Sequence, residues 1–428
     1  MTDRTDVVTT PAEISAATWL RRAETRAVFD AIEAGGHAVR AVGGTVRDTL
    51  CGREVTDIDL ATTALPEEVL RLGEAAGLRV VPTGLEHGTV TIIAGGIAHE
   101  VTTLRRDVET YGRRARVAFT TDWRADAGRR DFTMNALYCD RDGTIFDPLG
   151  GYTDLVAGRV RFIGDADARV AEDTLRILRF FRFHGEYGRG AIDAIGLAAS
   201  FRGRRGLATL SRERVGGEFN RLLAAPGAPA VVATMAEHGL LAATLPIVPR
   251  LRLFAGLCAI ERAEALGPDP LRRLAALALH SGDGVARLVE YLRLSNAQAT
   301  RLAAIPPVSR AIHSETAPAE ARRLSFVHGR TAFIDGLLLA WAGDTGVSTD
   351  VNRTDAWRAL LRLGETWSPP AFPLAGRDLL ALGLAPGPEV GKLLKYLCDT
   401  WIADDFVPDR RALMKQAEEL IQDSTRRP

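Results

Sequence analysis

Residues 39–62 read VRAVGGTVRDTLCGREVTDIDLAT, and this stretch decides the fold. Apolar residues run into the glycine pair Gly43-Gly44, which predicts a short strand over residues 37–42. A helix is expected from the glycine pair to about Gly52, followed by a second strand over residues 57–62. The alternation of strand, helix and strand indicates that this part of the chain is a mixed α/β domain.

Asp57 and Asp59 form a candidate metal site on the second strand. Side chains two residues apart in a strand point to the same face and lie roughly 6.5 Å apart. Two carboxylates so placed can share a pair of Mg²⁺ ions, which sit about 3.5–4 Å apart in two-metal enzymes. For two aspartates alone, a turn or a solvated strand is the usual alternative.

The glycine pair and Arg47 are candidate phosphate ligands. Glycines let the backbone approach a ligand closely, and the start of a helix presents N–H groups to phosphate. The guanidinium of Arg47 adds a fork of donors for a triphosphate. A tight strand–helix turn that serves packing alone is the structural alternative. The chain has no GxxxxGK[ST] segment, which argues against a P-loop.

The composition is that of a soluble globular protein, with 46% hydrophobic and 25% charged residues. A length of 428 residues predicts two to four domains. No apolar run approaches the roughly 18 residues that a membrane span needs. The polar start MTDRTDVVTTPAE lacks the apolar core of an export signal, and the four cysteines form no CxxC pair. We therefore expect a cytoplasmic protein with reduced thiols.

The net charge is zero, so the overall charge gives no support for nucleic-acid binding. Arginines are nevertheless concentrated over residues 105–130, 176–189 and 202–214. A locally basic surface on a neutral protein can bind a phosphate backbone, and solvated helix faces are the alternative for each cluster.

The remaining pattern divides the chain into an α/β part and a helical part. Before residue 160 we expect a helix with apolar positions from Trp19 to Ile32, a helix opened by Pro66, and strands over 78–82, 89–94 and 97–104. After Phe162 helical periodicity dominates. Pro/Gly clusters interrupt it at residues 226–229, 246–249, 267–270, 306–307 and 369–373.

Four motifs occur in a fixed order: GGTVRD (43–48), DIDLAT (57–62), RRDFTMNAL (129–137) and EDTLRILRFFRF (172–183). Together they resemble the motifs of class II tRNA nucleotidyltransferases and the related bacterial poly(A) polymerases. The resemblance implies an α/β polymerase-β-like nucleotidyltransferase head followed by an all-α neck, body and tail. The expected boundaries are 1–36 for a leader and helix, 37–160 for the head, 161–225 for the neck, 226–340 for the body and 341–428 for a tRNA-binding tail.

The resemblance also implies roles for individual residues. Asp57 and Asp59 would be catalytic and hold two Mg²⁺ ions, with Glu100 either a third carboxylate or a structural strand residue. Residues 105–116 would correspond to a flexible loop, or be a plain solvated loop. The predicted nucleotide-binding residues are Gly44, Arg47, Arg130, Asp173, Arg176, Arg179 and Arg182.

The implied reaction is attack of the tRNA 3′-hydroxyl on the α-phosphate of CTP or ATP, which releases pyrophosphate and adds C, C and A. A poly(A) polymerase, an enzyme adding only CC or only A, and a non-catalytic tRNA-binding protein are the alternatives. Residues 81–90 lack the basic run of poly(A) polymerases, which favours tRNA. No histidine is followed by aspartate, so we expect no His-Asp phosphohydrolase activity.

Asp173 and Arg176 are expected at positions i and i+3 of one helix, where their side chains are neighbours. Such a pair can read the amino group and ring acceptor that cytosine and adenine share, or form an ordinary surface salt bridge. Phe180, Phe181 and Phe183 are expected in the core.

Two further segments are candidates for contact with RNA. The arginines of FRGRRG (201–206) and SRERVGGEFNRLL (211–223) can grip the acceptor stem, or Ser211 can simply cap an amphipathic neck helix. The tail, with Arg377, Lys392 and Lys395, is expected to bind tRNA.

Overall fold

A computed structural model describes residues 7–8, 11–111, 114–279, 283–345 and 351–426. Its backbone contacts divide the chain into one unit that ends at Ile247 and a second that begins at Val248. The first unit contains the sheet and the helices that follow it, and the second unit is helical over its described residues.

The first unit is built on an eight-stranded sheet, as expected of an α/β head. Its central strand β3 pairs in parallel with β6 and antiparallel with β2. In spatial order the strands are β1 (Val7–Val8), β10 (Ile145–Phe146), β9 (Tyr138–Cys139), β2 (Val39–Val42), β3 (Ile58–Thr62), β6 (Ile97–Thr103), β5 (Thr89–Ala94) and β4 (Arg79–Gly84).

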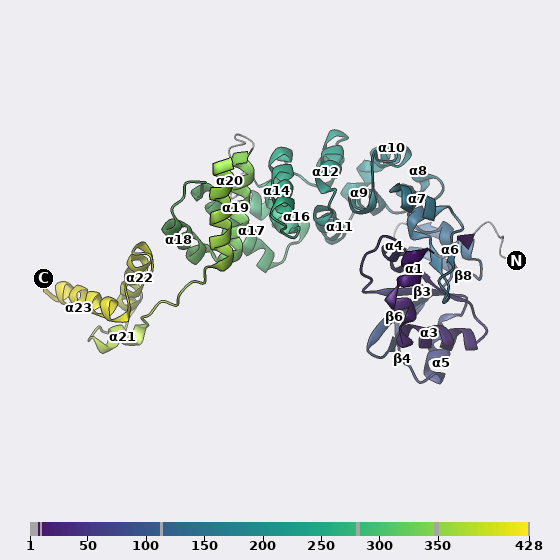
Figure 1. Cartoon of the computed structure of the whole chain (residues 1–428), viewed down its shortest axis with the longest axis horizontal. Helices are drawn as coiled ribbons and strands as arrows, with labels where there is room; N and C mark the ends of the chain where they lie inside the picture. Colours follow the sequence, from purple (N-terminus) through teal and green to yellow (C-terminus); the bar gives the residue numbers. More distant parts are fainter. Residues whose placement is uncertain (1–6, 9–10, 112–113, 280–282, 346–350, 427–428) are drawn as a thin grey trace. The chain divides into compact units, whose positions relative to one another are not determined.

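Proline and glycine set the start of one helix and the turn of one hairpin in this domain. Proline occupies the first turn of α5 (Pro66–Ala75), where its missing N–H costs nothing. The hairpin between β5 and β6 turns at Gly95-Gly96, and both glycines have positive φ. Helix α3 (Ala23–Ala34) and α5 pack together against β5 and β6 (Figure 1).

The single N-terminal helix expected through Trp19 and Ile32 is wrong. The chain forms α1 (Ala12–Ala16), α2 (Thr18–Arg21) and α3, because Ala17 and Arg22 adopt extended backbone. Trp19 is still buried, and its indole N–H donates to the hydroxyl of Thr49 at 2.8 Å. The polar leader also contributes β1, which extends the sheet beside β10.

Strands β7 (Arg105–Tyr111) and β8 (Arg114–Phe119) pair in antiparallel as a separate two-stranded sheet. The described part of the expected loop thus has strand backbone. The side chains of residues 107–117 lie outside the described ones.

The helical part of the first unit packs around α9 (Leu175–Tyr187), which contacts α8 (Ala166–Glu172), α10 (Ala194–Gly203), α11 (Arg212–Ala224) and α12 (Ala228–Glu237). Phe180, Phe181 and Phe183 are at most 2% exposed, so their prediction as core residues is confirmed. Phe132 and Phe162 stack with them and join α9 to the head. The unit also contains α6 (Trp123–Gly128), α7 (Gly151–Ala157) and α13 (Leu240–Thr244).

In the second unit, α19 (Arg330–Thr345) packs against α14 (Leu251–Ala263), α17 (Asn296–Ala311) and α20 (Val351–Thr366). The expected break at Pro306-Pro307 is wrong, because both prolines lie inside α17. Ile305 and Val308 beside them are fully buried, and Val308 packs where Gly336 of α19 has no side chain. This packing outweighs the backbone hydrogen bonds that proline removes. The other helices are α15 (Pro270–Ala278), α16 (Asp283–Leu292) and α18 (Pro318–His328).

The last three helices, α21 (Gly376–Ala381), α22 (Pro388–Ala403) and α23 (Arg410–Arg426), share an apolar cluster around Leu397 and Trp401. An ion pair between Arg322 of α18 and Asp405 joins this cluster to the rest of the second unit. Among the described residues, no helix combines the length and apolar character that crossing a membrane would require.

Candidate active site

The turn between β2 and α4 (Gly44–Leu50) is the centre of the site. Gly43 has φ +64° and ψ −118°, a conformation that side chains disfavour. A Cβ at this position would also lie 3.3 Å from Nη1 of Arg130, so glycine allows the close approach of that guanidinium. Gly44 follows as the first residue of the helix.

Thr45 links this turn to the aspartate strand, a role the sequence did not indicate. Its buried hydroxyl donates to the carbonyl of Asp57 at 3.2 Å and accepts the backbone N–H of Asp59 at 2.9 Å. The turn and the two aspartates are therefore held as one piece.

The two aspartates lie at the start of β3. Asp57 precedes the first strand residue and is exposed, whereas Asp59 lies within the strand and is partly buried. The strand register pairs Asp59 with Glu100 of β6. Burial and then the charge of Glu100 raise the pKa of Asp59 to about 6, with Asp57 adding to the effect and Arg130 opposing it. The site thus carries an excess of negative charge.

These carboxylates fit a divalent cation in their chemistry, because oxygen ligands suit Mg²⁺ and the like charges repel one another in its absence. Within the described part of the chain, no three acidic, histidine or cysteine side chains already converge closely enough to hold an ion. Glu100 lies next to Asp59 in the pairing of β3 with β6, but the three carboxylates do not form a converged ion site.

Arg130 is fixed beside the turn by a buried carboxylate. Its Nε and Nη2 donate to Oδ2 of Asp126 at 3.3 and 3.0 Å, and the hydroxyl of Tyr138 donates to the same oxygen at 2.8 Å. Arg129 donates to the other oxygen at 2.8 Å. Burial alone would raise the pKa of Asp126, but the two arginines and Tyr138 lower it to about 2. The backbone N–H of Arg105 also donates to Asp126, which anchors the start of β7.

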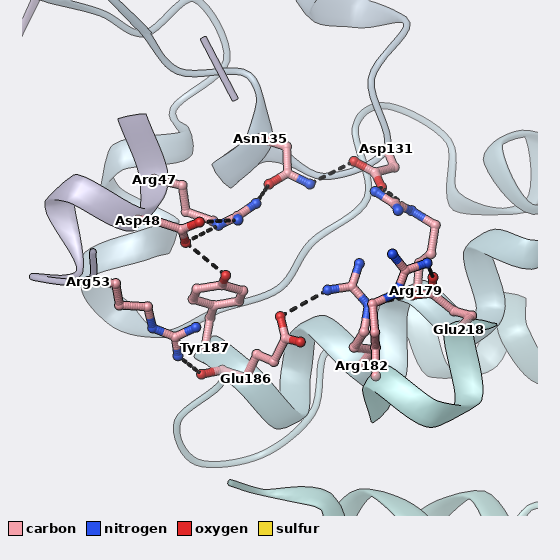
Figure 2. A network of polar contacts seen from close by, with 11 residues as sticks. Arg47, Asp48, Arg53, Asp131, Asn135, Arg179, Arg182, Glu186, Tyr187 and Glu218 are labelled. Carbon is pink, nitrogen blue, oxygen red and sulfur yellow. Dashed lines mark hydrogen bonds and ion pairs between the residues drawn. The ribbon is translucent and has the colours of Figure 1, made fainter. Parts of the chain in front are cut away.

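Arg47 lies inside a polar network (Figure 2). Its Nη1 donates to Oδ1 of Asn135 at 2.6 Å, and its Nε and Nη2 donate to the carboxylate of Asp48 at 3.0 and 2.9 Å. All three nitrogens of this predicted triphosphate ligand have protein partners, and its side chain is 10% exposed.

The predicted residues Arg179 and Arg182, both on α9, turn to different partners. Arg179 donates through Nε and Nη2 to Oδ2 of Asp131 in the head, at 2.7 and 2.5 Å. Arg182 is buried and pairs with Glu218 of α11 and with Glu186 of its own helix. Figure 2 shows both arginines beside Asp131 and Glu218.

The expectation that Asp173 and Arg176 share one helix is wrong. Asp173 has extended backbone between α8 and α9, because its carboxylate accepts the N–H of Leu175 at 3.1 Å and competes with a continuous helix. Its two oxygens also accept from Arg214 of α11 at 3.1 and 2.6 Å. Arg176 instead pairs with Glu172.

The expected RNA-contact segments expose an aromatic and several cations. Phe201 is 42% exposed, and the guanidinium of Arg204 lies 3.9 Å above its ring. Ser211 precedes α11 at its expected N-cap position. In the last helices Arg377 is exposed, and Lys392 and Lys395 are exposed side chains paired within α22.

Two family models match segments of this chain. The model of the Poly A polymerase head domain matches residues 39–161, and the model of the probable RNA and SrmB-binding site of polymerase A matches residues 203–251. The mitochondrial CCA tRNA nucleotidyltransferase 1 of Danio rerio is 35% identical over 85% of this chain and 83% of its own length.

Two bacterial proteins cover more of the chain. The CCA-adding enzyme of Limosilactobacillus fermentum is 30% identical over 97% of this chain and 99% of its own length. The crystal structure of the Bacillus stearothermophilus CCA-adding enzyme in complex with CTP is similar with a TM-score of 0.71 and 25% identity, over 95% of this chain and 98% of the other.

Proposed function

The chain belongs to the CCA tRNA nucleotidyltransferase family, and we propose that it adds C, C and A to the 3′ end of tRNA from CTP and ATP. The observation that carries this proposal is the aspartate pair held by Thr45 against the Gly43-Gly44 turn, with Arg130 next to Gly43. This arrangement brings carboxylates for metal beside a guanidinium for phosphate.

A divalent metal is the general cofactor of this class of enzyme, and we propose two Mg²⁺ ions held by Asp57 and Asp59. Bound there, the ions would lower the pKa of the attacking hydroxyl and offset the charge of the leaving pyrophosphate. Glu100 is the proposed third carboxylate, because the register sets it beside Asp59.

The residues around the turn would position the nucleotide. Gly44 lets the triphosphate approach the backbone, and Arg130 supplies a guanidinium that Asp126 and Tyr138 hold in place. Because Arg47 is held by Asp48 and Asn135, its proposed contact with the triphosphate requires it to share or exchange these partners. Catalysis then rests on orientation and charge rather than on a protein nucleophile.

Asp173 and Arg176 are the proposed template for the base. The carboxylate accepts the exocyclic amino group of cytosine or adenine, and the guanidinium donates to the ring acceptor beside it. Uracil and guanine present a carbonyl and a ring N–H instead, so they leave both groups mispaired. To bind the base in this way, Asp173 must release Arg214 and Arg176 must release Glu172. Arg179 and Arg182 would orient the template from the following turns of α9.

Variants of these two residues test the template. Asp173→Ala and Arg176→Ala should lower the preference for CTP and ATP over UTP and GTP, measured as ratios of kcat/KM for all four nucleotides. Arg323→Ala is the control, because it removes a half-exposed arginine that pairs with Glu320 on α18 and has no proposed role in nucleotide binding. Wild-type discrimination in both template variants would contradict the assignment.

The RNA surface is proposed over Phe201, Arg202 and Arg204 and over the last three helices. A stacked, exposed Arg–Phe pair offers a base or ribose a flat contact, and the nearby arginines offer phosphate contacts. The tail lysines would add contacts to tRNA phosphates.

A nucleotide-incorporation assay tests the function as a whole. Transcripts ending before C, after C, after CC and after CCA are offered each labelled nucleotide separately. The proposal predicts CTP incorporation on the first two, ATP incorporation on the third and none on the fourth. Incorporation of ATP alone on every transcript would indicate a poly(A) polymerase, and failure of one step would indicate a CC- or A-adding enzyme.

We also propose that the enzyme is cytoplasmic, since its four cysteines are all free thiols, as a reducing compartment favours. Cell fractionation with an antibody against the protein tests this.

A further inference from the structure

Hydrogen bonds join helix α9 to the head at two points and, together with the helix itself, form a closed ring (Figure 2). At one point Arg179 donates to Asp131, which accepts from Asn135 at 2.8 Å. At the other point the hydroxyl of Tyr187 donates to Oδ1 of Asp48 at 2.8 Å. Arg47 closes the ring, because it donates both to Asn135 and to Asp48.

Guanidinium groups pack against the aromatic rings at the Tyr187 end of this network. Arg47 lies 4.5 Å from the ring centroid of Tyr187 and 5.0 Å from that of Phe183. The guanidinium of Arg53 lies 4.2 Å from the ring centroid of Tyr187, and it donates to the carbonyl of Glu186. Tyr187 is thus held by its ring as well as by its hydroxyl, and burial raises its pKa to about 12, which keeps it a neutral donor.

The two attachment points fix the helix in both rotation and register. Arg179 and Tyr187 are eight residues apart, which corresponds to about 12 Å along a helix axis. Aromatic packing of Phe132 and Phe162 also holds α9 against the head, but it is not directional, whereas two hydrogen-bonded contacts at this separation set the rotation and register of the helix. By contrast, the pairing of Arg182 with Glu218 ties α9 to α11 and adds no contact with the head.

We propose that Tyr187 is a positioning residue that holds the phosphate turn and the base-reading end of α9 at a set separation. This inference rests on the proposed function, in which the triphosphate binds beside Gly44 and the base is read by Asp173 and Arg176. Tyr187 touches neither group of the nucleotide. It acts through Asp48 on Arg47, and its helix carries Arg176 toward the base.

A single atom tests this role. Tyr187→Phe in the full chain keeps the ring and its contacts with Arg47 and Arg53 but removes the hydrogen bond to Asp48. We expect the KM for CTP and for ATP to rise about tenfold, the size expected for one hydrogen bond to a charged group. The kcat at saturating nucleotide should fall less than about threefold, and the KM for tRNA should not change, because the hydroxyl positions the nucleotide only.

The hydrogen-bonded ring also predicts that Tyr187→Phe weakens base selection, and that its effect on the nucleotide KM does not add to that of Asp48→Ala. Because the separation between phosphate turn and template becomes variable, the ratio of kcat/KM for CTP to that for UTP should fall in Tyr187→Phe. In an Asp48→Ala background the same substitution should change the nucleotide KM no further, since its acceptor is gone. Tyr152 and Tyr187 line one cavity together with Arg53 and Glu186. Tyr152→Phe, which removes a tyrosine hydroxyl outside the hydrogen-bonded ring, is therefore the matched control and should behave as wild type.

Three outcomes separate the inference from the function on which it rests. A lower melting temperature with unchanged nucleotide KM and unchanged CTP-to-UTP ratio would reduce Tyr187 to a packing role and overturn the inference. If Tyr187→Phe gives that result while Arg130→Lys raises the nucleotide KM, the proposed triphosphate site stands and only the positioning role of Tyr187 is lost. If Arg130→Lys also leaves the nucleotide KM unchanged, the proposed site is wrong and the inference falls with it.

Discussion

Each of the two units contains a group of carboxylates, and the two groups are balanced in opposite ways. In the second unit Glu261 and Asp335 are 1% exposed, and three arginines neutralise them. Arg272 pairs with both carboxylates, Arg273 with Glu261 and Arg301 with Asp335. In the first unit burial and then the like charge of Glu100 raise the pKa of Asp59 to about 6, with Asp57 adding to the effect.

The difference shows what each group is for. Buried carboxylates with well-placed guanidinium partners hold helices α14, α15, α17 and α19 together and specify how they pack. Repelling carboxylates at an open strand end weaken the fold when no cation offsets their charge. A site that keeps this imbalance is prepared for a cation, because binding relieves the repulsion as well as forming new contacts.

The largest effect is expected at Asp59. Asp59→Asn should lower the rate of nucleotide transfer by about a thousandfold or more, because several kcal/mol of charge stabilisation by the metal are lost. The same change should leave the metal-free protein as stable as wild type or more stable. The raised pKa means that the carboxylate favours folding at pH below about 4 and opposes it as the pH rises through about 6.

Thermal unfolding with and without Mg²⁺ at pH 7 checks both halves of this prediction. Mg²⁺ should raise the melting temperature of wild type and not that of Asp59→Asn. In metal-free buffer the variant should gain at most about 3 kcal/mol, the equivalent of the shift in pKa. Near-wild-type transfer by the variant, or a large loss of its metal-free stability, would show that the carboxylates around Asp59 serve the fold as those around Asp335 do.

Asp335→Asn probes the balanced group and should give the opposite result. Removing this charge leaves Arg272 and Arg301 short of a buried partner, and we expect a loss of about 3–5 kcal/mol of unfolding free energy. Transfer per folded molecule should persist at a temperature where the variant stays folded. Asp355→Asn, which removes an exposed partner of Arg358, is the control and should change stability by less than about 1 kcal/mol.

Asp126 combines both behaviours, because it is a balanced carboxylate within the catalytic head. Asp126→Asn should lower stability by about 2–3 kcal/mol at pH 7, from the shift of its pKa to about 2. A lowered pKa stabilises the fold above about pH 4, and the contribution disappears as the pH falls toward 2. The difference in urea unfolding between wild type and variant should therefore shrink over that range. A difference that stays constant down to pH 2 would mean that the loss is one of packing.

The locally encoded part of the head was predictable from the sequence. The strand before Gly43, the helix after it, the strand of Asp59 and the Gly95-Gly96 hairpin all depend on glycine conformation and short apolar runs. The carboxylate pair and the glycine turn could be recognised for the same reason, since both lie within a few residues of sequence.

The parts that were missed depend on contacts between distant residues. Tyr187 meets Asp48 across 139 positions, and no periodic pattern marks such a pair. Asp173 leaves the helix because its side chain captures a nearby N–H and Arg214. Pro306-Pro307 stays helical because α19 packs against it, which local propensity does not record.

The smallest effect is expected where charges are exposed and balanced only weakly. Lys392 and Lys395 on α22 have side chains 71% and 78% exposed, and they pair with Glu389 and Asp399. Replacing both lysines with alanine should change the unfolding free energy by less than about 1 kcal/mol, because exposed ion pairs contribute little. If the tail binds tRNA, the KM for tRNA should rise and its dependence on the logarithm of salt concentration should weaken by about one to two units. Arg323→Ala on α18, which removes a side chain 52% exposed and paired with Glu320 within its own helix, is the control and should leave both values unchanged. A tRNA KM that is the same in the lysine variant and in wild type across salt concentrations would show that these charges are balanced within α22 alone, and would limit RNA contact to other residues.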